Sequence, residues 1–254
     1  MIVIFFHDRF QVRCDLLAAS LNHQVYPYSL YSIQPWNTAG VRKQDVFDDL
    51  TDVVRAFGSG RRFELVEMLA QGQHSVESLA TNCNMATTTT SNNLQILKHN
   101  GLVATRRAGT TIFYQLAGED VLELFLAAKR VALRCNATLR HSLETFLGSP
   151  SAQGPTIDAS LVTDHMLVVD VRPRDEYEAG HFPGAISIPM DQLPERYDEL
   201  PRDRQVVVYC RGELCRLARE AAVTLRGYAL DAIAMDDGIA EWRVGQEITL
   251  DYAS

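Results

Sequence analysis

The sequence contains no long apolar segment. Its first apolar run, residues 2–6, is five residues long and lacks the basic residues that open a signal peptide. No later window approaches the roughly 18 uninterrupted apolar residues that a membrane helix requires. We therefore expect a cytoplasmic protein that makes no contact with a membrane.

Cysteine is scarce, and its spacing does not suggest a disulfide framework. The five cysteines are an odd number scattered over the whole chain: Cys14, Cys83, Cys135, Cys210 and Cys215. A secreted, disulfide-stapled domain is thereby excluded, and free thiols in a reducing cytosol are expected.

The chain has no excess of basic residues, and its formal net charge is −8. Residues 41–150 carry 12 Lys and Arg against 11 Asp and Glu, whereas residues 151–254 carry 10 against 19. The acidic second half is therefore an unfavourable surface for nucleic acid, so any DNA-binding surface belongs to the first half. The length of 254 residues and the hydrophobic content of 46% indicate one or two globular domains.

The most informative segment surrounds Cys210. The apolar run Val206–Tyr209 predicts a buried parallel strand that ends at this cysteine, and a helix is expected over Leu217–Arg226. Open α/β sheets bind ligands at such strand ends, where loop amides and a helix N-terminus favour an anion. Arg211 and Arg216 add positive charge, so we expect a lowered pKa for Cys210 and a nucleophilic role rather than a core one.

Three ordered motifs flank this strand. They are a strand ending in Asp170-Val171-Arg172, the run Glu176-Tyr177 to Gly180-His181-Phe182-Pro183-Gly184-Ala185, and Gly238-x-x-x-Trp242. Together they resemble the rhodanese family over roughly residues 155 to 250. The resemblance implies an α/β domain over residues 156–254 with a central, mainly parallel sheet. It also implies a persulfide on Cys210, cradled by Arg211, Gly212, Glu213, Leu214, Cys215 and Arg216.

Two positions of this loop leave alternatives open. Cys215 is interpreted either as a thiol that resolves the persulfide or as a buried cysteine at the start of a helix. Glu213 stands where related fused proteins have Pro or Gly, and a carboxylate beside an anion-binding loop is electrostatically unfavourable. Thiosulfate and a low-molecular-weight persulfide are therefore both retained as the sulfur donor.

The first half has the periodicity of a winged helix-turn-helix. Helical spacing is followed by two short strands around Ala108-Gly109. The predicted helices are Arg61–Ala70, Ser75–Cys83 and Thr87–Asn100, and the predicted strands are Leu102–Arg107 and Thr111–Leu116. We therefore expect an α+β winged helix-turn-helix domain ahead of the α/β domain.

This domain, residues 41–147, resembles the ArsR family of repressors. The resemblance lies in Leu94-x-x-Leu97, Gly101-Leu102-Val103, Arg106-Arg107-x-Gly109 and Tyr114-x-Leu116, and fusions of such a domain to a rhodanese tail form a known family. It implies operator DNA as a partner and a recognition helix that Thr87 is expected to cap. The expected DNA contacts are Thr87, Thr88, Thr89, Ser91, Asn92, Gln95 and Lys98 on that helix and Arg106 and Arg107 on the wing.

The segment Glu119–Leu147 is predicted to form one long helix with an apolar stripe. ArsR-like repressors dimerise through this helix, so the resemblance implies a homodimer. Residues 148–155 have the Gly, Ser and Pro content of a linker. Residues 1–40 fit neither family, and they are interpreted either as lying before a start at Val41 or as an ordered extension.

No metal or other cofactor is expected. Metal-sensing relatives carry a Cys-x-Cys where this chain has Ser75-Val76-Glu77, and His141 and Glu144 alone cannot form a four-ligand zinc site. Sulfur-sensing relatives pair two cysteines, but Glu67 occupies the position of the expected partner of Cys135. We therefore expect Cys135 to be an inert interface thiol and Cys83 to face the core.

Three functions are compatible with these sequence features. The leading one is a transcriptional repressor whose rhodanese tail accepts sulfane sulfur and thereby changes DNA affinity. The second is a sulfurtransferase enzyme whose first half serves dimerisation. The third is a phosphatase or arsenate reductase, because Cys210 and Arg216 form a Cys-x5-Arg pattern, although Tyr209 stands where those enzymes place His.

Overall fold

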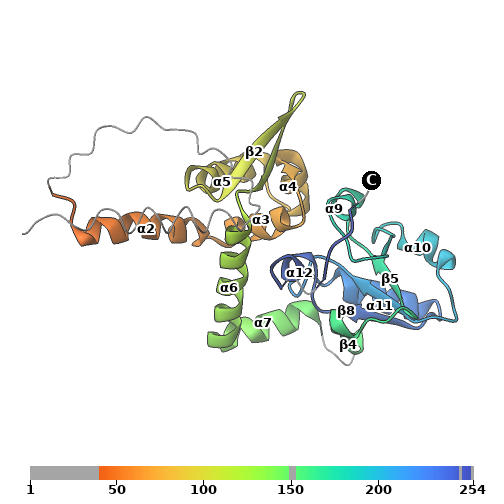
Figure 1. Ribbon diagram of the computed structural model, residues 1–254. Helices are drawn as coiled ribbons and strands as arrows, with labels where there is room; N and C mark the ends of the chain where they lie inside the picture. Colours follow the sequence, from red (N-terminus) through yellow and green to blue (C-terminus); the bar gives the residue numbers. More distant parts are fainter. Residues whose placement is uncertain (1–39, 149–152, 246–247, 253–254) are drawn as a thin grey trace, which may run out of the picture. The chain divides into compact units, whose positions relative to one another are not determined.

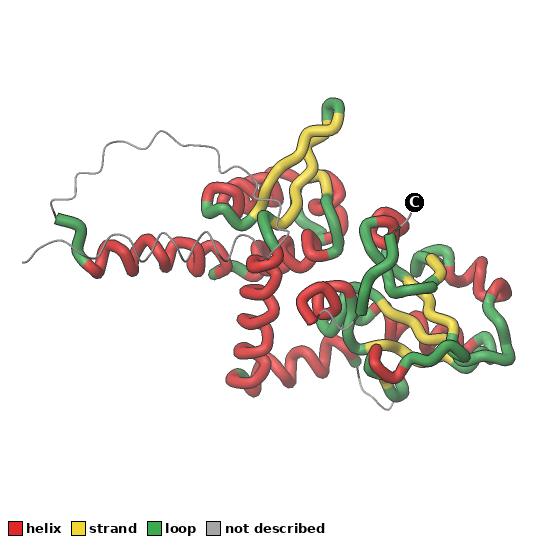
Figure 2. Tube along the Cα trace, in the orientation of Figure 1, coloured by secondary structure: helices red, strands yellow, loops and turns green. Residues whose placement is uncertain are grey.

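The computed structural model describes residues 40–148, 153–245 and 248–252. Residues 46–254 belong to one compact unit, which contains a helical module followed by an α/β module (Figures 1 and 2). The extension expected at residues 1–40 lies outside the described residues except for Gly40, and the linker expected at 148–155 lies partly outside them. Among the described helices, none is long and apolar enough to cross a membrane.

The N-terminal module contains the predicted helix-turn-helix. Its helices begin and end within two residues of the expected bounds, and one further helix, α2, precedes them. Leu65, Leu94 and Leu97 are completely buried in its core, as the apolar spacing requires. The helices are α2 (Lys43–Phe57), α3 (Gly60–Ala70), α4 (Val76–Asn82) and α5 (Thr87–His99).

A three-stranded antiparallel sheet completes this module. Its order is β1 (His74–Ser75), β3 (Thr111–Leu116), β2 (Val103–Ala108). Strands β2 and β3 form the wing, with Ala108 paired to Thr111 across a two-residue turn. Gly109 has a φ of +61° in this turn, a backbone conformation that favours glycine. The predicted wing is therefore present.

The prediction of one continuous helix over residues 119–147 is wrong. The structure has two helices, α6 (Glu119–Cys135) and α7 (Ala137–Leu147), which are separated at Asn136. Asn136 has extended backbone angles, and its side chain accepts a hydrogen bond from the Leu139 amide at 3.0 Å. An asparagine side chain that caps a new helix satisfies an amide that would otherwise lack a partner, and this explains the break.

The C-terminal module is built on the predicted sheet. Its strands follow the order β4-β8-β7-β5-β6, and all neighbouring strands are parallel. Every residue of β7 is buried because apolar clusters cover both faces of the sheet. The strands are β4 (Thr156–Ile157), β5 (Leu167–Asp170), β6 (Ile186–Ser187), β7 (Val206–Tyr209) and β8 (Ala232–Met235).

Several α-helices of this module lie around the sheet. They are α9 (Arg174–Glu178), α10 (Leu193–Arg196), α11 (Leu217–Gly227) and α12 (Ile239–Gly245). Helix α11 packs an alanine-rich face against β7 and β8, which places its N-terminus beside the end of β7. Helix α12 packs Ile239 and Trp242 into the core beside β7, and it also contributes the buried Ala240 to the core of the N-terminal module.

Candidate functional site

The turn after β7 brings two thiols together. Cys210 follows the strand directly, is 2% exposed, and donates a hydrogen bond from its Sγ to the carbonyl of Cys215 at 3.6 Å. Cys215 lies partly exposed near the start of α11. We call residues 210–216 the Cys210 loop. Gly212 in this loop has a φ of +140°, so the tight return of the chain depends on glycine at that position.

The two thiols differ in acidity, and the expectation of a lowered pKa for Cys210 is wrong. Burial, followed by hydrogen bonding to Cys215, raises the pKa of Cys210 well above its usual value. The hydrogen bond with Cys210 lowers the pKa of Cys215 to about 6, assisted by the Leu217 amide and the charge of Arg211. Cys215 is therefore the more acidic thiol of the pair.

The arginines of the loop are not free cations, which explains part of this difference. Arg211 pairs with the buried carboxylate of Glu176 at 2.6 Å, and Arg216 pairs with Glu220 one helical turn further along at 2.8 Å. Each charge is largely neutralised by its own partner. Glu176 was not identified as a site residue from the sequence, although it belongs to the Glu-Tyr motif.

Alkylation should report the acidic thiol. We expect the rate of iodoacetamide addition at Cys215 to rise with pH through about 6, because the thiolate is the reactive form. Cys210→Ala should move this midpoint to higher pH, since the hydrogen bond that stabilises the thiolate is lost. Peptide mass mapping of labelled protein measures both rates. An unchanged midpoint in the variant would contradict the hydrogen-bonded pair.

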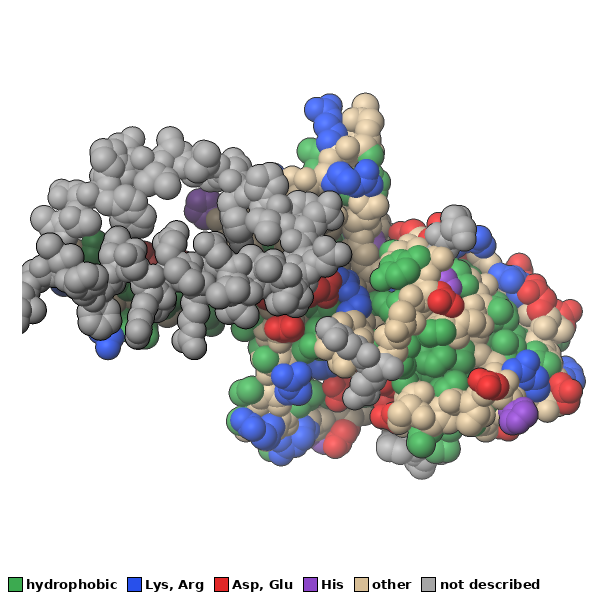
Figure 3. Space-filling model, in the orientation of Figure 1, with side chains coloured by type: hydrophobic (Ala, Val, Ile, Leu, Met, Phe, Trp, Pro, Cys, Tyr) green, Lys and Arg blue, Asp and Glu red, His purple; other side chains and the backbone are tan. Residues whose placement is uncertain are grey.

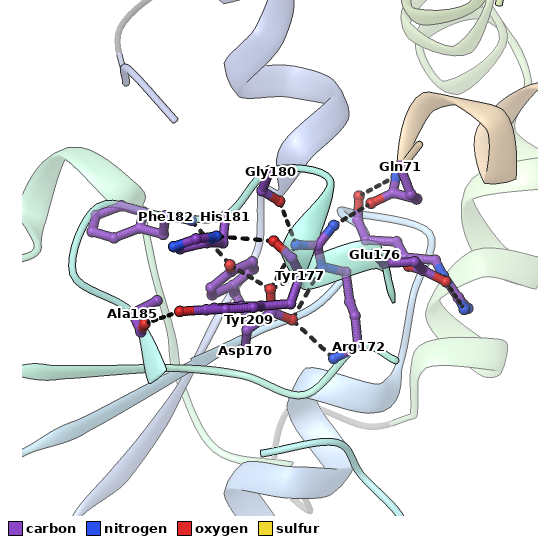
Figure 4. Close-up of polar contacts among 11 residues, drawn as sticks. Gln71, Asp170, Arg172, Glu176, Tyr177, Gly180, His181, Phe182, Ala185 and Tyr209 are labelled. Atoms are coloured by element: carbon purple, nitrogen blue, oxygen red, sulfur yellow. Dashed lines mark hydrogen bonds and ion pairs between the residues drawn. The ribbon is translucent and has the colours of Figure 1, made fainter. Parts of the chain in front are cut away.

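A buried polar network lies at the strand end that precedes the loop (Figure 4). Arg172 and Asp170 are both 0% exposed, and the guanidinium Nη2 lies 2.6 Å from the carboxylate Oδ2. Tyr209 donates its hydroxyl to the same carboxylate at 2.6 Å and accepts the Phe182 amide at 3.0 Å. The motif ending in Asp170-Val171-Arg172 is thus explained: Arg172 compensates the buried carboxylate of Asp170, and the Tyr209 hydroxyl bond to that carboxylate ties the ends of β5 and β7 together.

The Gly-x-x-x-Trp element approaches the loop from α12. A Cβ atom on Gly238 would lie 2.6 Å from both the Arg211 carbonyl carbon and the Gly212 nitrogen. Trp242 is buried and donates its indole N–H to Asp237 at 2.7 Å. Glycine at position 238 therefore lets the loop backbone come close to α12.

A hollow of about 450 Å³ adjoins the loop, within the size range of small-molecule sites. Arg211 and Leu217 line it on the loop side, and Pro173 and Met190 line it opposite. A small molecule has room there beside Arg211 of the Cys210 loop.

The residues expected to contact DNA lie mostly on one exposed surface. On α5 the exposed ones are Thr87, Thr88, Thr89, Asn92, Gln95 and Lys98, whereas Ser91 is half-buried. Lys and Arg side chains gather on the projecting β2–β3 hairpin, where Arg106 and Arg107 are exposed (Figure 3). This surface combines polar side chains with a positively charged wing.

Several of these side chains have partners within the module. Gln95 donates to the Tyr114 hydroxyl at 3.0 Å, and Lys98 donates to Thr105 at 3.1 Å. Arg106 donates to Gln73 at 2.9 Å. The bonds of Gln95 and Lys98 join helix α5 to the wing, so the exposed polar side chains of both elements lie on one connected surface.

The structure also gives the positions of three further residues from the sequence analysis. Thr87 is the first residue of α5 and Ala86 precedes it as the cap, so the predicted Thr87 cap is wrong. Cys83 is buried as expected, and burial raises its pKa to about 12. Cys135 is exposed at the end of α6. In the described part of the chain, no three His, Cys, Asp or Glu side chains are grouped as a metal site requires.

Comparison with known proteins agrees with both modules. Residues 157–244 match the model of the rhodanese-like domain. The class is therefore a winged helix-turn-helix transcriptional regulator joined to a rhodanese-like domain. The HTH-type transcriptional regulator Rv0324 of Mycobacterium tuberculosis is 42% identical over 207 residues, which cover 80% of this chain and 91% of that protein. The chain belongs to the family of this regulator.

Two further relatives each match one module. The homodimeric winged helix-turn-helix DNA-binding domain of Mb0332 from Mycobacterium bovis is 42% identical, covering 39% of this chain and 92% of that fragment, with a TM-score of 0.37. A sulfurtransferase of Allochromatium vinosum is 35% identical over 80 residues, covering 32% of this chain and 74% of that protein.

Proposed function

We propose that this regulator binds operator DNA as a homodimer and accepts sulfane sulfur on Cys210, so that sulfur loading changes its affinity for DNA. The observation that carries the sulfur chemistry is the pair of Cys210 and Cys215 at the end of a parallel strand. Cys215 is the more acidic thiol of this pair. The M. bovis relative is a homodimeric DNA-binding domain and the A. vinosum relative is a sulfurtransferase, so their sequence similarity supports the dimer and the sulfur chemistry, respectively.

The thiol pair supplies both a base and a nucleophile. The Cys215 thiolate takes the proton of Cys210, and the Cys210 thiolate then attacks the outer sulfur of thiosulfate. The sulfur–sulfur bond of thiosulfate breaks, and sulfite leaves with its electron pair. Cys210 then carries a persulfide. A low-molecular-weight persulfide serves as donor in the same way, with its thiolate as the leaving group.

Sulfur loading should be visible by intact mass. Incubation with thiosulfate or glutathione persulfide should add one sulfur, about 32 Da, to the wild-type protein. Cys210→Ser should remain unmodified, whereas Cys215→Ser should still load, although more slowly because its base is missing. Retention of the adduct in Cys210→Ser would move the acceptor to Cys215.

Operator affinity should depend on the sulfur state. Coupling between two sites of one protein is typically worth about 1–3 kcal/mol, or roughly 5- to 150-fold in affinity. We expect a change of this size when a labelled promoter fragment is titrated with unloaded and then with persulfidated protein. Cys210→Ser exposed to the same donor is the control and should show no change. Equal affinities in both states would leave DNA binding and sulfur chemistry independent.

Direct DNA contacts are proposed for the exposed surface of α5 and the wing. The short polar side chains Asn92 and Thr88 have a size that suits base edges and phosphates in a major groove. Arg106 and Arg107 suit phosphate or minor-groove contacts.

A sulfurtransferase enzyme is the second candidate, favoured by the sulfurtransferase of A. vinosum. It requires that loaded Cys210 pass its sulfur to an acceptor such as cyanide repeatedly. The phosphatase alternative receives no support from Arg216, because its side chain is 52% exposed and paired with Glu220. A Cys-x5-Arg enzyme needs that arginine on its anion.

A further inference from the structure

The Cys210 loop is contacted by a lysine of the N-terminal module. Lys129 lies on α6, is 6% exposed, and places its Nζ 3.1 Å from Glu213 of the loop. The same Nζ lies 2.5 Å from Glu241 of α12. Thus a single buried cation from the DNA-binding half is shared between two carboxylates of the rhodanese-like domain.

This lysine is held in its charged form. Burial alone favours a neutral amine, but the ion pairs with Glu241 and Glu213 raise the pKa of Lys129 above its usual value. A buried charge of this kind is retained only when partners compensate it. The interaction therefore constrains Glu213 as much as it stabilises Lys129.

A second contact joins the same two modules at the loop. Gln71, at the end of α3, is 2% exposed. Its Nε2 donates to the Arg211 carbonyl at 3.4 Å, and its Oε1 accepts from Arg172 at 3.2 Å (Figure 4). Backbone and side chain of the loop are thus both held by the N-terminal module.

The positive charge of Lys129 matters for the loop because the arginines of the loop are already paired. Arg211 and Arg216 are paired with other carboxylates. A hollow beside Glu213 of the loop is also lined by Glu241 and two aspartates, with Arg219 as the cation of the lining. Removing Lys129 would therefore leave two carboxylates beside the loop without the cation that they share.

We propose that Lys129 is a positioning residue of the sulfur site: through its ion pair with Glu213 it neutralises the loop and allows an anionic sulfur donor to approach the cysteines. The proposal rests on the proposed sulfur chemistry for its consequence, but its electrostatic part is independent of sulfur. It also explains how the loop tolerates a glutamate at position 213.

A nearby carboxyl group agrees with this view of the contact. Glu67 of α3 has a pKa raised to about 7, first by burial and next by the negative charge of Cys215, while Lys129 and Arg211 act in the opposite direction. A carboxyl group of the N-terminal module therefore senses both the loop thiol and Lys129. The two modules share one electrostatic environment at this place.

The electrostatic part is tested with two alkylating probes on the full chain. Iodoacetate carries a negative charge and iodoacetamide does not, so the ratio of their rates at Cys210 and Cys215 reports the potential at the loop. Lys129→Met should lower this ratio about two- to fivefold, the effect of one charge several ångströms away in a partly solvated site. Peptide mass mapping assigns the labelled thiol.

Three further variants distinguish an electrostatic effect from a folding defect. Glu213→Gln changes a partly exposed side chain and should raise the ratio above wild type, in the opposite direction. The double variant Lys129→Met, Glu213→Gln should return the ratio toward wild type. Arg130→Met removes the next cation of the same helix, which is exposed, and should leave the ratio unchanged. A ratio that does not respond to Lys129→Met or to Glu213→Gln overturns the proposal.

Sulfur loading then tests the consequence. Lys129→Met should raise the thiosulfate concentration needed for half-maximal loading by a similar factor, with the maximal rate largely kept. An effect on the maximal rate alone would contradict a role in donor approach. If wild-type protein does not load at all, the proposed function fails, whereas the probe ratio still decides the role of Lys129.

Discussion

Replacing Arg172 by methionine should lower the free energy of unfolding by about 3–5 kcal/mol. The guanidinium is completely buried and is the counter-charge of the equally buried Asp170, with Nε at 3.0 Å and Nη2 at 2.6 Å from the carboxylate. Without it, Asp170 keeps only the Tyr209 hydroxyl and the residue 172 amide as donors. Urea denaturation of the full chain, followed by circular dichroism, measures the loss.

A matched control is available two residues further along the chain. Arg174 pairs with Glu178 at 2.9 Å, but its side chain is 74% exposed. Arg174→Met should therefore change stability by less than about 1 kcal/mol. The double variant Arg172→Met, Asp170→Asn should recover part of the loss, because no buried charge then lacks a partner. Equal effects of Arg172→Met and Arg174→Met would show that the buried pair contributes no more than an exposed one.

Substituting alanine for Gly238 should reduce sulfur loading at Cys210 by roughly tenfold or more. The added Cβ would meet loop backbone at 2.6 Å, and backbone cannot rotate away as a side chain does. The loop must shift, and a displacement of about 1 Å at a reacting group can cost about 100-fold in rate. Loading is followed by intact mass after thiosulfate addition.

Gly227 offers the control for this substitution. A Cβ atom there, at the end of α11, would meet nothing within 4 Å. Gly227→Ala should load at the wild-type rate. Normal loading in Gly238→Ala would mean that the close approach of α12 to the loop does not position the thiols.

The sequence predicts this fold well where local patterns decide it. The four apolar residues of β7 predict a strand buried on both faces, and a parallel sheet covered on both sides provides that environment. The helix-turn-helix follows from apolar spacing, and the wing follows from the Ala108-Gly109 turn. Motif order places Cys210 at the end of the central strand, where the structure has it.

The electrostatics of the site could not be predicted in the same way. Arg211 and Glu176 are 35 positions apart, and only the fold reveals that the charge of Arg211 is already paired. Lys129 and Gln71 carry no local signal at all, because their partners lie more than 80 positions away in a different module. The expectation of a lowered pKa for Cys210 therefore fails, because burial raises that pKa and the nearest cation is already paired.

The single long helix fails as a prediction for another reason. An apolar stripe predicts which face of a helix is apolar, but it does not show whether the helix is continuous. Asn136 interrupts the helix while the apolar spacing continues past it. Asparagine is an ordinary residue in a helix sequence, so its capping role becomes visible only through its hydrogen bond to the Leu139 amide.

The burial of Ala240 in the core of the N-terminal module has a practical consequence for dissecting this protein. If the two modules were expressed separately, the DNA-binding half would lack Ala240 of α12, which is part of its core. It would also leave the ammonium group of Lys129 without either of its carboxylates. Each excised half would expose a surface that is buried in the intact chain. Assays on isolated halves therefore need the full chain as their reference.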